Sequence, residues 1–248
     1  MNRAAGGTCL LRHFSGLASF LVIAAAAVAL PIACTRPTTP TPTPPSAEAV
    51  RDRTVEALRT LTTVHFAVTH AEGGTDLGAG ITLTSVEGDA LFPDRAKLSA
   101  QTVVEGLGVN LEMGLVQIGP QTYLRDPLSR VWRTTERGVL PFNFVGMHES
   151  LADALAAMTG LTLSDGGQVD GVETHRLTGV VSPLAFAGLV LAAADGDALA
   201  VDVWIGRDDA LPRNVRLIGR LVARDPPDMT RSLRLADFDR PVSVEPPI

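Results

Sequence analysis

From Val64 onward, short stretches of alternating apolar and polar residues recur along the chain, as in residues 199–205. Successive side chains of a β-strand point to opposite faces, so this period of two predicts strands with one buried face. Turn residues such as Gly119-Pro120 separate the stretches, which indicates an antiparallel sheet built as a meander. We expect strands near residues 64–68, 81–84, 95–101, 109–115, 122–124, 131–134, 172–181, 199–205, 215–221 and 233–235.

Three other segments predict helices. The first runs over 46–61 with Ser46 as its N-cap, and the second begins at a Ser150 cap and ends at Gly160. The third, over 184–194, follows a Ser-Pro pair suited to a cap and first turn, and it has no polar face. The helices fall early and in the middle of the chain, so we expect them together on one face of the sheet. The predicted fold class is α+β, a curved antiparallel sheet with helices covering it.

The N-terminal region reads as a lipoprotein export signal. An apolar run ends in Leu30-Pro31-Ile32-Ala33-Cys34, with basic residues before it. We expect residues 1–33 to be a cleaved signal peptide, Cys34 to carry acyl chains, and 35–45, rich in proline and threonine, to be an extended linker. Pro31 departs from the usual pattern, which has leucine three residues before the cysteine. The alternative is an uncleaved apolar anchor. Either way, residues 46–248 form a single domain outside the cytoplasm.

Charge and cysteine content exclude several functions. The formal charge is −6, and removal of the signal leaves 19 basic against 27 acidic residues. No basic run is present, so nucleic acid is not an expected partner. Both cysteines, Cys9 and Cys34, precede the domain. It therefore needs no disulfide and offers no thiol nucleophile.

The search for catalytic or metal-binding residues gives little. His65 and His70 are five apart in a predicted strand, so they point to opposite faces and cannot share a metal ion. His148 and His175 have no ligand cluster near them in sequence, and we expect them at the surface or in loops. A nucleophile elbow of the Gly-x-Ser-x-Gly type is missing. We therefore expect neither an enzyme nor a metal site or cofactor.

Several short sequences resemble the LppX/LprA/LprF/LprG lipoprotein family of actinobacteria and relatives, over roughly residues 47–244. They are Val64-His65-Phe66, Gln121-Thr122-Tyr123-Leu124 with Val131-Trp132, the stretch 171–179, the stretch 201–205, and Leu211-Pro212-Arg213. The resemblance implies a half-barrel sheet whose concave face is covered by helices. It also implies an apolar cavity between them that takes the acyl chains of envelope lipids or glycolipids, with no chemistry performed.

The all-apolar segment 184–194 has two interpretations. It is either a core helix buried on every side or one wall of a lipid cavity. Acyl chains need apolar area without directional contacts, which suits a wall of alanine, leucine and valine. For the second interpretation we expect the cavity to be lined by Leu83, Leu111, Met113, Phe142, Phe144, Val145, Leu151, Leu155, Met158, Leu184, Phe186, Leu189, Val190, Val201 and Val203.

The sequence thus predicts a lipid-anchored lipoprotein on the extracytoplasmic face of the cell membrane. It would hold acyl chains in an apolar cavity and carry the lipid within the envelope, opening at the apolar loop 142–147. The expected partners are lipid or glycolipid acyl chains, the membrane through the anchor, and an envelope lipid transporter. The alternative is a non-carrier accessory lipoprotein that binds a protein partner through a domain with a solid core.

Overall fold

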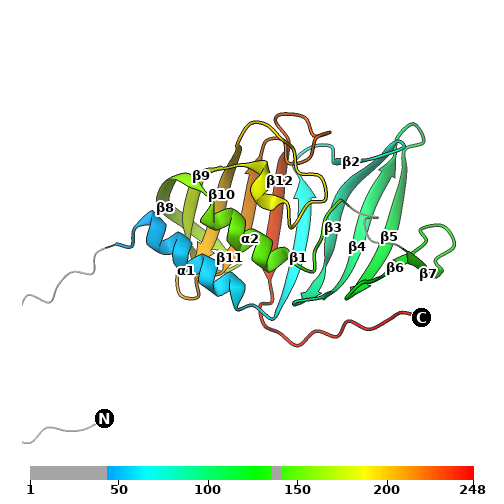
Figure 1. Ribbon diagram of the computed structural model, residues 1–248, viewed down its shortest axis with the longest axis horizontal. Helices are drawn as coiled ribbons and strands as arrows, with labels where there is room; N and C mark the ends of the chain where they lie inside the picture. The colour runs from blue at the N-terminus through cyan, green and yellow to red at the C-terminus, as the bar shows by residue number, and fades with distance from the viewer. Residues whose placement is uncertain (1–43, 136–140) are drawn as a thin grey trace, which may run out of the picture. The chain divides into compact units, whose positions relative to one another are not determined.

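The computed structural model describes residues 44–135 and 141–248. Within them, in the compact unit Thr43–Ile248, one twelve-stranded antiparallel sheet is accompanied by two α-helices and a 3₁₀ turn (Figure 1). The helical elements are α1 (Ala47–Arg59), α2 (Met147–Ala156) and η1 (Pro183–Phe186). The strands are β1 (Thr63–His70), β2 (Thr75–Gly78), β3 (Ile81–Leu91), β4 (Arg95–Val104), β5 (Val109–Ile118), β6 (Gln121–Arg125), β7 (Trp132–Thr135), β8 (Thr159–Val169), β9 (Val172–Val181), β10 (Leu199–Gly206), β11 (Pro212–Ile218) and β12 (Thr230–Ala236).

Strand β1 joins two meanders into one sheet. The strand order is β7-β6-β5-β4-β3-β1-β12-β11-β10-β9-β8, and β2 pairs with β3. Phe66 of β1 lies opposite Gly88 of β3 on one side and Leu235 of β12 on the other. In the described residues the order ends at β7 and β8, so the sheet is open. The predicted fold class, an antiparallel sheet with helices on one face, is confirmed.

Helix α1 forms where the sequence predicts it. The Ser46 hydroxyl accepts a hydrogen bond from the backbone N–H of Ala49 at 3.1 Å, which caps the first turn. Val50, Val55 and Leu58 are buried, so the apolar stripe of the helix faces the core. Both helices lie over the half of the sheet that contains β8 to β12 (Figure 1). No helix of the described residues is both long and apolar enough to span a bilayer.

Helix α2 begins earlier than predicted. It starts after Gly146, which provides no side-chain cap, and it ends at Ala156, so Gly160 lies in β8 instead of ending the helix. Ser150 is not the N-cap, because its backbone N–H donates to the Gly146 carbonyl at 3.1 Å inside the first turn. Met147 is 1% exposed. Burial of this extra turn against the sheet outweighs the capping signal.

The predicted helix over 184–194 is wrong. Only η1 is helical there, and the following residues form turns with isolated bridges, Phe142 to Val190 and Ala193 to Val222. A short apolar run fits a helix or an extended segment equally well, so packing decides its conformation. Here the backbone N–H groups of Leu189 and Val190 still bond to the Phe186 carbonyl within the turn. Beyond them the chain bonds to neighbouring segments, Leu191 to the Pro141 carbonyl at 2.9 Å and Ala194 to the Leu221 carbonyl at 2.8 Å.

The sequence does not predict strand β8, because Gly160 resembles the end of a helix and Gly166-Gly167 resemble a turn. Gly166 and Gly167 lie inside β8 at a register shift opposite β9. A Cβ at Gly166 would come within 2.4 Å of the Thr174 hydroxyl oxygen, so this close approach requires glycine. The actual turn follows at Asp170-Gly171, where both residues have positive φ.

Candidate functional site

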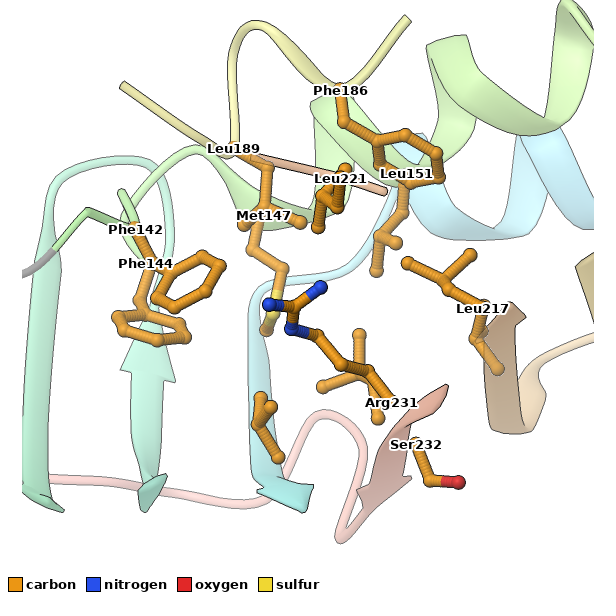
Figure 2. Close-up of a pocket in the computed structure, with 13 residues that line it drawn as sticks. Phe142, Phe144, Met147, Leu151, Phe186, Leu189, Leu217, Leu221, Arg231 and Ser232 are labelled. Carbon is orange, nitrogen blue, oxygen red and sulfur yellow. The ribbon is translucent and has the colours of Figure 1, made fainter. Parts of the chain in front are cut away.

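An apolar space of about 40 Å³ lies between α2 and strands β11 and β12. Figure 2 shows Phe186 and Leu151 on one side of it, Phe142 and Phe144 at one end, and Arg231 projecting toward it. It is lined by Val68, Phe142, Phe144, Met147, Leu151, Phe186, Leu189, Val215, Leu217, Leu221, Arg231, Ser232 and Leu233. All but two of these residues are apolar, so the space offers contact area with few hydrogen-bonding groups.

A second apolar space of about 10 Å³ adjoins the first and shares Leu151, Phe186 and Val215 with it. Cavities that bind small molecules usually measure roughly 300–1,000 Å³. A space of 10–15 Å³ suffices for about one water molecule, so both spaces are far too small for an acyl chain. The large cavity predicted beneath the helices is therefore not seen in the described residues. What lies there is an apolar core with small gaps.

Two segments without regular structure, residues 141–145 and 187–194, cover this core. We call them the cover segments. They are joined by hydrogen bonds from the backbone N–H of Asn143 to the Leu189 carbonyl at 2.7 Å and from Leu191 to Pro141 at 2.9 Å. Phe144 anchors the first segment by stacking on Phe66 of β1, with ring centroids 4.7 Å apart. The cover is thus held mainly by apolar packing and a few backbone hydrogen bonds.

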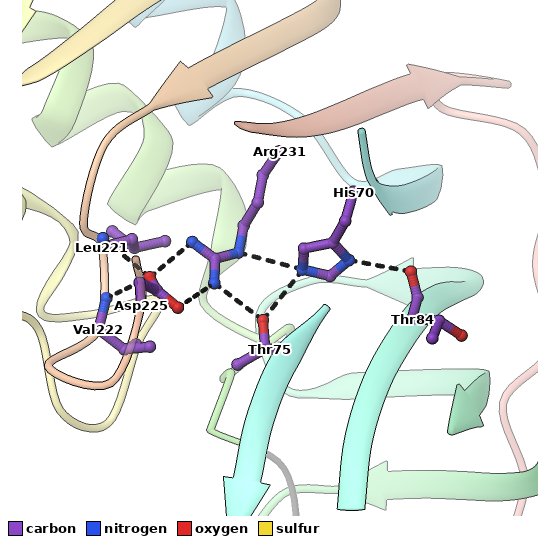
Figure 3. Close-up of polar contacts among 7 residues, drawn as sticks. All are labelled: His70, Thr75, Thr84, Leu221, Val222, Asp225 and Arg231. Carbon is purple, nitrogen blue, oxygen red and sulfur yellow. Dashed lines mark hydrogen bonds and ion pairs between the residues drawn. The ribbon is translucent and has the colours of Figure 1, made fainter. Parts of the chain in front are cut away.

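A buried ion pair borders the apolar space. Arg231 and Asp225 have side chains only 4% and 1% exposed, and their closest N···O distance is 2.5 Å (Figure 3). Asp225 also accepts hydrogen bonds from the backbone N–H groups of Leu221 and Val222 at 3.0 and 2.8 Å. Since Leu221 lines the space, the ion pair fixes the position of part of its wall.

His70 completes this network as a neutral imidazole. Its Nδ1 donates to the Thr84 carbonyl at 2.9 Å, and its Nε2 accepts from Arg231 Nε at 3.2 Å and from the Thr75 hydroxyl at 3.0 Å (Figure 3). A proton on Nε2 would face the guanidinium N–H and remove both acceptor bonds. Burial lowers the pKa of His70, and the charge of Arg231 acts in the same direction. His65, on the other face of β1, instead contacts Asp89 at 2.8 Å.

Apart from Leu184, the predicted lining residues fall into four groups in the structure, and Leu151 and Phe186 belong to two of them. Phe142, Phe144, Leu151, Phe186 and Leu189 line the larger space, and Leu151, Leu155, Met158, Phe186 and Val201 line the smaller one. Leu83, Val145, Val190 and Val203 are buried in the surrounding core. Leu111 and Met113 lie on β5 and are partly exposed.

Two predicted placements need correction. Leu184 is 54% exposed and lines neither space, because a 3₁₀ turn repeats every three residues and buries Pro183 and Phe186 on its other side. His148 is 6% exposed instead of lying at the surface. It lies inside α2, which begins before it, and its ring stacks on the ring of Phe92 with centroids 3.9 Å apart. Cys34 lies outside the described residues.

Sequence reasoning missed the contribution of β11 and β12. Val215, Leu217 and Leu233 line the space, as does Val68 of β1. The alternation of these strands identified their apolar faces, but it could not show which face lies under α2. Arg231 gave no signal, because its partner Asp225 lies in a connection that carries no motif.

Comparison with known proteins assigns this chain to a family. The family model described as "LppX_LprAFG lipoprotein" matches residues 46–244. The crystal structure of LprF from Mycobacterium bovis is similar, with a TM-score of 0.64 at 14% identity, covering 83% of this chain and 99% of that one. LppX from Mycobacterium tuberculosis is similar with a TM-score of 0.53 at 19% identity, covering 82% and 100%. Among proteins with curated descriptions, none matches significantly. The match over residues 46–244 shows that this chain belongs to the LppX_LprAFG lipoprotein family.

Proposed function

We propose that this protein is a lipoprotein, anchored through Cys34 on the extracytoplasmic face of the membrane, that holds lipid or glycolipid acyl chains between α2 and the sheet. It carries the lipid within the cell envelope and performs no reaction. The observation that carries the proposal is the apolar space beneath the cover segments, bounded by α2, β11 and β12. Membership of a lipoprotein family supports the anchor.

In this proposal the structure corresponds to the empty, closed state. An acyl chain enters when the cover segments separate from the sheet and from α2, and it replaces their contacts with its own. Each buried CH₂ group of the ligand contributes about 0.8 kcal/mol, so a long chain compensates for the loss of several side-chain contacts. Only a few backbone hydrogen bonds, such as Asn143 to Leu189, join the two segments to each other.

The direct test is lipid recovery. The unit 43–248, which contains its own core, is purified and extracted with organic solvent for mass spectrometry, and uptake of an added fatty acid is measured. We expect recovered lipid or stoichiometric uptake. Absence of both would overturn the carrier function and favour the accessory lipoprotein that binds a protein partner.

A matched pair of variants locates the lipid. Val215→Phe adds volume at a residue that lines both spaces, whereas Val180→Phe adds the same volume at a side chain that is 42% exposed. We expect Val215→Phe to reduce fatty acid uptake at least tenfold and Val180→Phe to leave it unchanged, with circular dichroism confirming that both fold. Equal uptake by the two variants would place the lipid elsewhere.

The anchor is tested separately in the full chain. Cys34→Ser removes the only expected acylation site, so we expect the protein to leave the membrane fraction or to be retained only as an unprocessed precursor. Intact mass spectrometry of the wild-type protein should show added acyl groups on a chain that begins at Cys34. A wild-type protein without acyl groups would contradict the anchor.

A further inference from the structure

The connection between β11 and β12, residues 219–229, is attached to the cover segments. The backbone N–H of Ala194 donates a hydrogen bond to the Leu221 carbonyl at 2.8 Å. Next to it, Ala193 and Val222 form an isolated antiparallel bridge. The end of the second cover segment is therefore held by Leu221 and Val222. We call residues 219–229 the latch loop.

One carboxylate holds the same two residues of the latch loop in place. Asp225 accepts hydrogen bonds from the backbone N–H groups of Leu221 and Val222 at 3.0 and 2.8 Å. Asp225 is itself fixed by Arg231 of β12, whose Nη1 donates to it at 2.7 Å. Figure 3 shows Leu221 and Val222 on one side of Asp225 and the guanidinium of Arg231 on the other. The point at which the cover is attached thus depends on the buried ion pair.

His70 is the member of this network that solvent protons can reach. It lies opposite Arg231 in the β1–β12 register, and Arg231 Nε donates to its Nε2 at 3.2 Å. His70 is only partly buried, whereas the side chains of the ion pair are 4% and 1% exposed. Histidine has an ordinary pKa of about 6.5, so its charge changes near neutral pH. A change of pH therefore enters the network at His70.

His70 faces four elements in the described part of the chain, and two of them bring a charge to it. β2 and β3 contribute the Thr75 hydroxyl and the Thr84 carbonyl, which are uncharged. β12 contributes Arg231, and the latch loop contributes Asp225. These two charges already pair with each other, so a positive charge on His70 would have no counter-ion of its own.

A proton on Nε2 of His70 would disturb this arrangement. It would set two N–H donors and two positive charges against each other, because Nε2 now accepts from Arg231 Nε. The guanidinium would have to move away from the imidazole. Since it is bound to Asp225, that movement shifts or breaks the ion pair, and Leu221 and Val222 lose the groups that hold them.

We propose that the latch loop is a proton-operated latch, which keeps the cover segments closed while His70 is neutral and releases them when His70 is protonated. Release of the cover gives access to the apolar space beneath it, whose wall includes Leu221 and Arg231. In the proposed function, acyl chains pass through this opening. That last statement rests on the proposed function, but the latch does not.

The direction of the pH effect follows from the closed geometry. Burial lowers the pKa of His70 in the closed state, and the charge of Arg231 acts in the same direction. A state in which His70 leaves this environment binds the proton more readily, so protonation favours opening. Opening should increase as the pH falls below the ordinary value of about 6.5, and it should be independent of pH above that value.

Hydrogen–deuterium exchange of the unit 43–248 measures opening without any lipid. Rates at pH 7.5 and 5.0 are each divided by the intrinsic exchange rate at that pH. We expect protection of the amides in 187–194 and 219–225 to fall at least threefold at the lower pH and to stay below that of β4, which reports unfolding of the whole domain. Equal protection of the cover and β4 would mean that the cover opens only when the domain unfolds, and it would overturn the latch.

A matched pair of variants assigns the effect to His70. His70→Gln places an amide near the Nε2 position, where its oxygen can accept from Arg231 but is not protonated in this pH range. His65→Gln makes the same change on the other face of β1, where His65 contacts Asp89 at 2.8 Å. We expect the pH effect on the cover to disappear in His70→Gln and to remain in His65→Gln. The same fall in both variants, or none in the wild type, would overturn the proposal.

A titration of the wild-type unit tests the latch even if His70→Gln does not fold. Nuclear magnetic resonance follows the imidazole of His70 and the amides of Ala194 and Val222 as the pH is lowered. We expect the three titration midpoints to coincide. Amides of Ala194 and Val222 that do not titrate, or that titrate with a different midpoint, would show that His70 does not control the cover.

Release of a fatty acid separates this inference from the carrier function. The unit is loaded with the fluorescent cis-parinaric acid, and its dissociation is followed at both pH values. We expect dissociation to be at least threefold faster at pH 5.0 in the wild type and in His65→Gln, and unchanged in His70→Gln. Opening that depends on pH in a protein that binds no fatty acid would retain the latch and reject the carrier. Fatty acid binding without such opening would retain the carrier and reject the latch.

Discussion

The two halves of the sheet bury the same kind of strand to different extents. Beneath α2, Val215 and Leu233 are 3% and 8% exposed, and a buried ion pair fixes the adjoining connection. On β5, the row from Val109 to Met113 stays partly exposed although its alternation is just as regular. The difference shows that alternation predicts a face suited to burial, while the elements packed against that face determine whether it is buried.

The halves should also differ in function. The helix-covered half holds the proposed lipid space, closed by the cover segments and bordered by Arg231. The β4–β7 half leaves the apolar row of β5 partly exposed. We therefore expect substitutions in the first half to affect stability and lipid retention, and substitutions on the exposed part of β5 to cost little stability.

The largest expected effect is at the buried ion pair. Asp225→Asn leaves Arg231 charged and buried without its counter-ion, which should lower the free energy of unfolding by about 3–5 kcal/mol. Asp237→Asn is the control, because Asp237 pairs with Arg240 at 2.8 Å with both side chains at least half exposed, and it should change stability by less than about 1 kcal/mol. Urea denaturation followed by circular dichroism measures both. Similar losses in the two variants would show that burial does not distinguish them.

A pair of truncations tests the contrast between the two halves directly. Leu151→Ala removes a side chain that is 3% exposed and lines both apolar spaces, so we expect a loss of about 2–5 kcal/mol. Leu111→Ala, on the partly exposed row of β5, should cost less than about 1.5 kcal/mol. A larger loss at Leu111 would mean that the β5 row is as firmly packed as the helix-covered core.

The buried histidines make stability depend on pH. Burial lowers the pKa values of His70 and His148, so the unfolded chain binds protons more readily than the folded one. Stability should therefore be complete above the unfolded value of about 6.5 and fall as pH decreases through the lower folded-state pKa values. His70→Asn should make the loss between pH 7 and 5 smaller, as measured by urea denaturation at each pH. An unchanged pH profile would exclude His70 as a contributor.

The smallest expected effect is at the surface of the helix pair. Arg59 of α1 and Asp153 of α2 lie 3.1 Å apart with side chains 50% and 68% exposed. Asp153→Asn should lower the free energy of unfolding by less than about 1 kcal/mol, because water and salt screen exposed pairs. Thermal denaturation at low and high salt checks this. A loss comparable to that of Asp225→Asn would contradict the view that apolar packing holds the helices in place.

Local patterns in the sequence determined most of the fold. The alternation predicted ten of the strands, and the Ser46 cap with an apolar stripe predicted α1, because strand and helix periods are properties of short segments. The resemblance to the lipoprotein family was likewise carried by short sequences. The start of α2, in contrast, depended on burial of Met147, which no local signal shows.

Only the tertiary structure decided the rest. An apolar run such as 184–194 suits several conformations, and its hydrogen bonds to 141–143 and Leu221 selected an irregular cover instead of a helix. The Arg231–Asp225 pair likewise depends on segments that come together only in the folded chain. The size of the apolar space could not be predicted from the sequence either, because it depends on how side chains from five separate segments fit together. Composition identifies residues that can be buried, but the room left between them is set by packing.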